Sequence, residues 1–413
     1  MSRFSSETFL HLFGSRYAYI LLVAGIIVMP IAITIAKVLL VLGVALRLLA
    51  LVLSKELLSK KDFFYALPIA IFLLWHLVCV LYSPYSSDGI ASVVVKLPLI
   101  LYVIAFLGLR IESDMLLKCM KYISISLFVI FLYLLFKASF QYQKLQIGAV
   151  FFNESLARPI MHPGYLSYYY LMPTLFWMQR FFAHPNRRCF LYLIAVGLPL
   201  FMLISKVSYI VFFLFLIVLI VQGLRRRYYS LKQIVIGFAF FCAAAYLLIS
   251  STTIQNRFIE IGNAFKSDYS KVTAGHSTPA RVLLWRIALG YIAKEPVWGY
   301  GTGAGRNVLD NHYVKHDMTS FHKYKLNSHN QYLHFLLDNG LVGLMIFVIA
   351  MIAYAKHFWQ NRIYFGVAIL FAWAAIFATD DMLEVQAGTM LFGFYIALAI
   401  AYANSKLAFA NLK

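Results

Sequence analysis

The chain has 413 residues, of which 62% are apolar and only 13% are charged. Because charged residues make up about a quarter of a soluble protein, this composition excludes an ordinary soluble domain and indicates a polytopic membrane protein. Membrane topology and anionic lipid headgroups are then the first explanation for the formal net charge of +20. We therefore expect a phospholipid bilayer as partner, and no nucleic acid.

Long apolar segments recur along the chain at about the length that crosses a bilayer, roughly 20 residues. They predict an all-α membrane protein of about twelve transmembrane helices, at residues 17–34, 36–54, 63–82, 90–109, 120–139, 163–183, 189–204, 207–223, 232–250, 331–354, 363–379 and 387–404. The first two segments run close together, as do the seventh and eighth, so each pair is expected to form a tight hairpin.

Basic residues concentrate in every second connection, as at Arg225–Arg227, which indicates the cytoplasmic side. The other connections nearly lack them: Ser83–Gly89 has no base, and Asp380–Gln386 carries three acids and no base. This pattern predicts that both termini are cytoplasmic and that two longer segments, near 140–162 and 251–330, lie outside. The basic residues of segment 251–330 do not contradict this assignment, because the preference of Lys and Arg for the cytoplasmic side applies to shorter loops.

Arg281 is a candidate anion-binding residue at the start of a predicted helix. Thr278 supplies a capping hydroxyl and Pro279 suits the first helical position, so a helix is expected over Arg281–Lys294. A second helical stretch is expected at 254–265. A guanidinium beside free backbone N–H groups favours phosphate. The alternative is an interfacial arginine that reaches lipid headgroups.

His329 is a candidate general base. Asn327 or Ser328 can cap the tenth apolar segment, which places His329 in its first turn at the outer surface. The positive helix end then keeps the imidazole neutral and able to accept a proton. Gly340 falls on nearly the same helical face, and with Gly343 it allows another helix to approach closely. The alternative is a solvated loop histidine.

Lys206 lies between two apolar segments, where an ionised side chain costs about 3 kcal/mol unless it faces a partner or a polar cavity. No acid is near in the sequence, so an anionic ligand is a candidate partner. The alternative is a lysine whose stem reaches the outer surface. In the shorter outer segment, Arg158 and His162 are further candidates for binding an anion, whereas the Tyr168–Tyr170 run is typical of a membrane belt.

Two other patterns point away from familiar sites. Glycines alternate from Gly299 to Gly305 without a preceding strand or a following Lys-Ser/Thr, so they predict a flexible turn and not a P-loop. His312, His316 and His322 have no accompanying acid motif or zinc signature. We therefore expect neither a metal nor a cofactor.

Taken together, these residues resemble the O-antigen ligase family, within the wider group that includes O-antigen polymerases and bacterial protein O-oligosaccharyltransferases. Ser277 to Trp285 is similar to the family's Arg-x-x-Leu-Trp segment, Pro296 to Gly303 to its Pro-x-x-Gly-x-Gly turn, and His329-Asn330 with Gly340-Leu341 to its histidine motif. The hydropathy layout of the whole chain is also similar.

The resemblance implies a metal-independent glycosyltransferase of the GT-C class that moves an O-antigen glycan from undecaprenyl diphosphate to lipid A-core. His329 matches the catalytic histidine and Arg281 the loop arginine. Lys206 stands where better-known ligases have arginine, which keeps the charge but loses the bidentate fork. Lys206 and Arg281 are also expected to bind substrate, together with Arg158, His162 and Asn330.

This interpretation places the chain in the bacterial inner membrane with its site facing the periplasm. Residues 1–250 are expected to hold transmembrane helices 1 to 9 and a short periplasmic segment near 140–162. Residues 251–330 are the periplasmic loop that carries catalytic residues, between helices 9 and 10. Residues 331–413 hold helices 10 to 12.

In the expected reaction, His329 takes the proton of an acceptor hydroxyl, which attacks and inverts the anomeric carbon. Lys206 and Arg281 stabilise the departing diphosphate. The alternatives are an O-antigen polymerase, whose acceptor is a second lipid-linked glycan, and a protein O-oligosaccharyltransferase. A transporter of lipid-linked glycan is a different class, and Lys96 within the fourth apolar segment fits it best.

Overall fold

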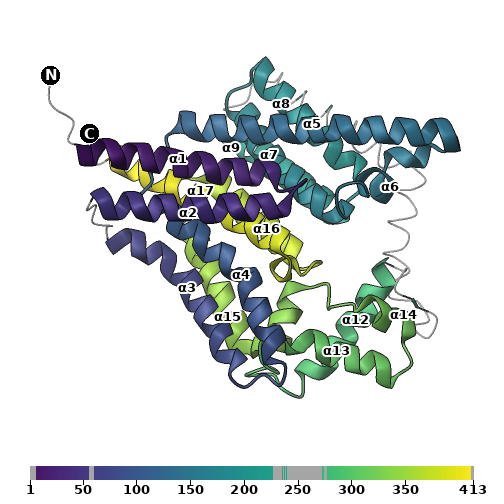
Figure 1. The fold of residues 1–413 in the computed structure, drawn as a ribbon. Helices are drawn as coiled ribbons and strands as arrows, with labels where there is room; N and C mark the ends of the chain where they lie inside the picture. The colour runs from purple at the N-terminus through teal and green to yellow at the C-terminus, as the bar shows by residue number, and fades with distance from the viewer. Residues whose placement is uncertain are drawn as a thin grey trace, which may run out of the picture.

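The computed structural model describes residues 6–54, 60–226, 272–273 and 277–410, with residues 235, 237 and 239 in addition. Every regular element in these ranges is helical, which confirms the expected all-α class (Figure 1). The α-helices are α1 Ser6–Val28, α2 Ile33–Ser54, α3 Lys60–Val80, α4 Ser86–Phe106, α5 Ser113–Leu145, α6 Asn153–Ala157, α7 Pro163–Ala183, α8 Arg187–Met202, α9 Lys206–Arg226, α12 Ser277–Ile292, α13 Ala304–Lys315, α14 Thr319–Tyr324, α15 Gln331–Gln360, α16 Tyr364–Phe377 and α17 Gln386–Ala410. Short 3₁₀ turns are at η1 Gly148–Phe151 and η3 Met382–Glu384.

Seven of the described helices are long and apolar enough to cross a membrane, namely α2, α3, α4, α5, α9, α15 and α17. Gly14–Val28 in α1 and Tyr364–Phe377 in α16 are apolar but shorter. At 1.5 Å per residue, a helix of about 15 residues covers only part of a hydrocarbon core that is roughly 30 Å thick. The expected segments 232–250 and 254–265 lie outside the described residues.

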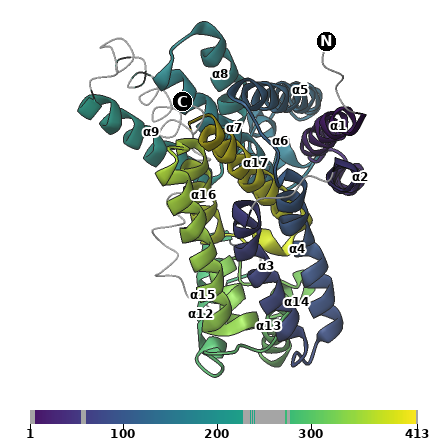
Figure 2. The same ribbon diagram turned by 90° about the vertical axis from the view of Figure 1, so that its left-hand side faces the viewer.

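The helices pack in two groups that meet at α17 (Figure 1). α3, α4 and α15 lie side by side in both views, and α12, α13 and α14 gather at one end of them (Figure 2). α5, α7 and α8 form the other group, and α9 and α16 pack against α7. α17 is buried along most of its length, from Met390 to Ala403. This arrangement brings the loop that precedes α17 to the ends of α7, α12 and α15.

The first expected hairpin is present, because α1 and α2 pack closely against each other. The second is not a tight hairpin: α8 and α9 are joined by the short connection 203–205, beside which the Phe201 and Phe212 rings lie 5.1 Å apart, but α8 packs against α5 and α7, and α9 against α7 and α16. Ile204 in this connection has a φ of 48°, in the left-handed region that a β-branched residue rarely adopts. The surrounding packing therefore holds this connection, which leads into α9 at Lys206, in a strained conformation.

α15 is broken at Gly340, whose backbone, with φ 63° and ψ −167°, is not helical. In an unbroken helix, the amides of Leu341 and Val342 donate to the carbonyls of Leu337 and Asp338, four residues earlier. The break releases these four backbone groups. A buried backbone group without a partner is costly, so another segment has to supply hydrogen bonds here.

The turn at residues 296–301 supplies all four of these hydrogen bonds. The carbonyls of Pro296 and Val297 accept from the two released amides, at 2.9 and 3.4 Å. The amides of Tyr300 and Gly301 donate to the two released carbonyls, at 2.8 and 2.9 Å. The turn and the kinked helix are therefore joined by their backbones and form one unit.

The glycines of this turn correct the expectation of a flexible segment. A Cβ on Gly299 would lie 2.6 Å from the Gly340 nitrogen, and Gly299 has a φ of 71°. The alternating glycines thus allow close backbone contact and left-handed geometry in a fixed turn. Gly340 admits this turn and not another helix, whereas Gly343 packs against Trp75 of α3, as a helix contact requires.

Replacing Gly340 with alanine tests this junction. The new Cβ would overlap the Val297 carbonyl oxygen at a left-handed backbone position. We expect Gly340→Ala to lower the free energy of unfolding by about 2 kcal/mol or more. The measurement is the thermal unfolding midpoint of the purified protein in detergent.

Gly290→Ala is the matched control, because a Cβ at Gly290 in α12 meets nothing within 4 Å. Alanine also favours a helix over glycine by about 1 kcal/mol. The control should keep or raise the midpoint. Equal midpoints for the two variants would contradict the described junction.

Candidate functional site

Asp380, in the loop between α16 and α17, joins side chains from three other elements. It is only 6% exposed. The Tyr168 hydroxyl of α7 donates to its Oδ2 atom. Arg281 Nη2 of α12 donates to its Oδ1 atom at 3.2 Å, and His329 Nδ1 lies 3.8 Å from the same oxygen. One carboxylate therefore brings together the predicted anion-binding arginine and the predicted general base.

The environment of Asp380 keeps this carboxylate ionised. Burial raises the pKa of Asp380, but Arg281, His329 and Tyr168 more than offset that effect, and the pKa is below its ordinary value. The neighbouring Asp381 has a raised pKa, chiefly because burial is not offset to the same extent. Two adjacent carboxyls thus have opposite pKa shifts, an arrangement often found at functional sites.

A cavity of about 130 Å³ adjoins Asp380 and is also lined by Arg281, Lys206, His162 and Tyr168. Three residues that the sequence suggested for anion binding, Lys206, Arg281 and His162, therefore share one cavity. Lys206 begins α9, and its Nζ atom donates to Thr278 Oγ1 at the start of α12 at 2.8 Å. This hydrogen bond ties the two helix starts together beside the cavity.

His162 and Arg158 differ in how they relate to this cavity. His162 precedes α7, and its Nδ1 atom accepts a hydrogen bond from Gly164 N at 3.2 Å. The pKa of His162 is lowered chiefly by burial, so its imidazole is neutral near pH 7. Arg158 pairs with Glu154 at 3.1 Å on the surface, and only Glu154 lines the cavity.

The start of α15 differs from the sequence expectation. The N-cap is Asn330, not Asn327 or Ser328, and its Oδ1 atom accepts from the amides of residues 332 and 333. Asn330 Nδ2 donates to the Ala378 carbonyl at 3.0 Å, so both ends of this amide bind backbone. Its role in substrate binding stays a prediction.

His329 consequently lies before α15 and not in its first turn, so the expected alignment with Gly340 on one helical face is wrong. The kink at Gly340 would break that alignment in any case. His329 has a φ of 47°, a left-handed backbone conformation that is uncommon outside glycine. Its amide donates to Asn327 Oδ1 at 3.3 Å. The backbone at His329 is therefore set by this local turn and not by the helix.

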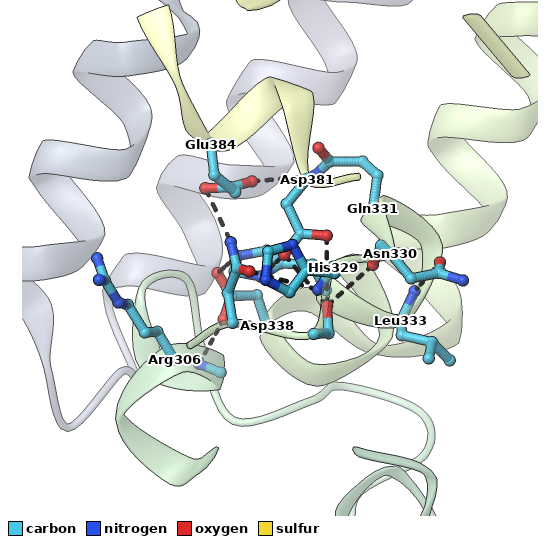
Figure 3. Close-up of polar contacts among 12 residues, drawn as sticks. Arg306, His329, Asn330, Gln331, Leu333, Asp338, Asp381 and Glu384 are labelled. Atoms are coloured by element: carbon cyan, nitrogen blue, oxygen red, sulfur yellow. Dashed lines mark hydrogen bonds and ion pairs between the residues drawn. The ribbon is translucent and has the colours of Figure 1, made fainter. Parts of the chain in front are cut away.

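A buried ionic cluster lies next to His329, and sequence analysis did not assemble it. Lys96 of α4 is fully buried, and its Nζ atom lies 2.7 Å from each carboxylate oxygen of Glu384. His334 Nε2 of α15 lies 3.5 Å from Glu384 and 3.5 Å from Asp338. Figure 3 shows Glu384 and Asp381, from the loop before α17, facing His329 and Asp338.

Glu384 lies against two basic side chains of this cluster, those of Lys96 and His334. Burial raises its pKa, but His334 and Lys96 outweigh burial and hold the pKa well below its ordinary value. Gln331 Nε2 also donates to Glu384 at 3.0 Å. Two features of the sequence belong to this cluster. Lys96 in an apolar segment fits a transporter in the sequence analysis, and the three acids before α17 indicate the side of the membrane.

Asp338 connects this cluster to the glycine turn. Its two carboxylate oxygens accept from the amides of Gly303 and Gly305, at 2.8 and 2.6 Å. These amides are at the start of α13, where a helix has unpaired N–H groups that favour an acceptor. α13 is thus fixed to α15 by a side chain, next to the backbone junction at Gly340.

These features define a polytopic helical membrane protein with a buried ionic site where α7, α9, α12 and α15 meet. Residues 190–348 match the family model described as O-antigen ligase. This segment includes Lys206, Arg281 and His329. The resemblance seen in the sequence is therefore confirmed for this segment of the chain.

A protein of Rickettsia conorii, named as a polysaccharide ligase, is 26% identical to this chain over 82 residues. The match covers 19% of this chain and 20% of that protein. The chain therefore matches about a fifth of the length of this curated relative.

The buried pair of Lys96 and Glu384 can be tested by stability measurements. Lys96→Met leaves the Glu384 carboxylate buried without its closest cation, and we expect a loss of about 3 kcal/mol in the free energy of unfolding. Combining it with Glu384→Gln should cost less than the sum of the two single changes, because the partners interact directly. Unfolding midpoints in detergent measure all three variants.

Lys118→Met is the matched control, because Lys118 pairs with Asp114 at 2.6 Å on the exposed surface of α5. Surface pairs of this kind contribute little. We expect no measurable change. If Lys96→Met behaves as this control does, the buried pair has no structural role.

Proposed function

We propose that this protein is an O-antigen ligase, which transfers a glycan from undecaprenyl diphosphate to lipid A-core. The observation that carries the proposal is the contact of Asp380 with both Arg281 and His329, beside a cavity that Lys206 also lines. The match to the O-antigen ligase family supports this class of reaction. Donor, acceptor and mechanism belong to the proposal.

The diphosphate of the donor binds in the cavity between Lys206 and Arg281. Arg281 is 28% exposed at its side chain and uses one nitrogen for Asp380. Among the residues that the structure describes, its other N–H groups donate no hydrogen bond, so they are available for phosphate oxygens. Both cations act more strongly in a partly buried cavity than in water. Their charge stabilises the departing diphosphate without a metal.

His329 acts as the general base, and Asp380 positions it. The Asp380 carboxylate lies 3.8 Å from Nδ1 and favours a proton on that nitrogen, which leaves Nε2 to face the acceptor hydroxyl. Nε2 takes the hydroxyl proton while the oxygen forms a bond to the anomeric carbon. The bond from that carbon to the diphosphate oxygen breaks, and its electron pair leaves with the diphosphate. Attack opposite the leaving group inverts the anomeric centre.

The proposed setting is the bacterial inner membrane, with the site at the periplasmic face. The chain then has about twelve transmembrane helices, and residues 251–330 form a periplasmic loop in a GT-C-class enzyme. His162 lines the same cavity as Lys206 and is the better placed of the two additional candidates in the segment 140–162. Arg158 is proposed to act at the cavity entrance through Glu154.

Reconstitution with purified components tests the base and the arginine. We expect His329→Ala to lower the rate of transfer from undecaprenyl-diphosphate-linked glycan to lipid A-core by about 100-fold or more. Arg281→Ala should lower it by a similar factor, because the leaving group loses a fixed charge. Lys206→Arg should retain activity, since the charge is kept. Transfer is measured from the shift of lipid A-core on gels.

Arg286→Ala is the control, because Arg286 is an exposed arginine of the same helix, α12, and does not line the cavity. It should transfer at the normal rate. A normal rate for His329→Ala would remove the proposed base. Equal losses in Arg286→Ala and Arg281→Ala would indicate a general effect on α12.

Deleting the gene separates a ligase from an O-antigen polymerase, which shares the donor. Loss of a ligase should leave long lipid-linked polymer and a bare core. Loss of a polymerase should instead leave core capped with a single repeat unit. The lengths of glycan on lipid A-core and on the lipid carrier, resolved on gels, measure the outcome. The relative named as a polysaccharide ligase favours the first result.

A further inference from the structure

A second and larger cavity, of about 510 Å³, is lined by His329 on the side of α13 and α4. It shares no lining residue with the cavity of Lys206 and Arg281. The contact between His329 and Asp380 joins the two, since Asp380 lines only the smaller one. A general base at this boundary can reach a group held in the larger cavity.

The larger cavity is rich in hydrogen-bond acceptors. Three carboxylates line it, Asp88, Asp310 and Glu384, together with Asn307 and Arg306 of α13. Figure 3 shows Arg306 and Glu384 on the side of the cluster away from Asn330 and Leu333. Carboxylates accept hydrogen bonds from hydroxyl groups, and Arg306 and Lys325, which also line the cavity, add donors to its wall. The chemistry of this wall therefore suits a polyhydroxylated ligand.

The polar groups of the wall retain capacity for a ligand. Asn307 Nδ2 donates to Asp88 Oδ2 at 2.8 Å, and His322 Nδ1 lies 2.8 Å from Asp310 Oδ1. These contacts use only one carboxylate oxygen of Asp88 and one of Asp310. The second oxygen of each is a further acceptor.

His334 is a buried histidine of the cavity wall, only 5% exposed. Its Nε2 atom lies 3.5 Å from Glu384 of the same wall, and its Nδ1 atom lies 3.7 Å from Asp381 Oδ2. These contacts hold the His334 ring in place beside the cavity.

We propose that the larger cavity binds the acceptor sugar, whose reacting hydroxyl faces His329. This inference rests on the proposed function and assigns the acceptor to residues of α4 and α13. A volume of about 510 Å³ is within the usual range for small-molecule sites, roughly 300 to 1,000 Å³. α13 is anchored by Asp338 at both Gly303 and Gly305, so Asn307 and Asp310 are held in place before the sugar arrives.

Steady-state kinetics with the full chain in lipid nanodiscs test the assignment. Asn307→Leu and Asp88→Asn remove polar contacts from the cavity wall but touch neither Lys206 nor Arg281. We expect each to raise the KM for lipid A-core by about tenfold, as the loss of one or two hydrogen bonds to a sugar does. The KM for undecaprenyl-diphosphate-linked glycan should stay unchanged, which also shows that the variants fold.

Asn311→Leu is the matched control, because Asn311 is one turn further along α13 and contacts Tyr85 at 3.0 Å outside the cavity. It should leave both KM values unchanged. An unchanged KM for lipid A-core in Asn307→Leu and Asp88→Asn overturns the inference, as does a raised KM for the donor. If the unaltered protein transfers no glycan, the proposed function itself fails, and that result is distinct from either of these.

Discussion

The site depends on the contacts of one ionised carboxylate, that of Asp380. It lies between a guanidinium, a phenol and an imidazole that come from three different elements. Desolvating a carboxylate is costly, and only such partners offset the cost. The loop between α16 and α17 is therefore fixed where α7, α12 and the start of α15 meet, and the geometry of His329 relative to Arg281 follows from that position.

Asp381 extends the same loop into the second ionic cluster. It accepts hydrogen bonds from Ser328 at 3.2 and 3.4 Å and lies near His334. Adjacent residues of one loop thus contact the surroundings of both cavities.

The sequence was sufficient for the fold class, most helices and the residues that identify the family, because hydropathy and local motifs carry that information. The sequence expectation failed where structure depends on distant pairing. Lys96 and Glu384 are 288 residues apart, and neither position alone indicates the other. Asp380 was visible as an acid in a base-free loop, but that pattern was explained by topology. Tyr168 was assigned to a membrane belt, although its hydroxyl binds Asp380.

The break in α15 also could not be deduced from residue patterns. Gly340 lies within an apolar run that is typical of a continuous helix, and the partner turn is joined by backbone atoms, which leave little trace in side-chain chemistry. The break in α15 also bears on the order in which the helix and the turn form. The amides of Leu341 and Val342 donate to the carbonyls of Pro296 and Val297, so α15 is incomplete until that turn is in place. Unpaired backbone groups are poorly tolerated in a nonpolar environment. The turn at residues 296–301 is therefore a structural part of α15, and α15 reaches its final form only when this turn is bound to it.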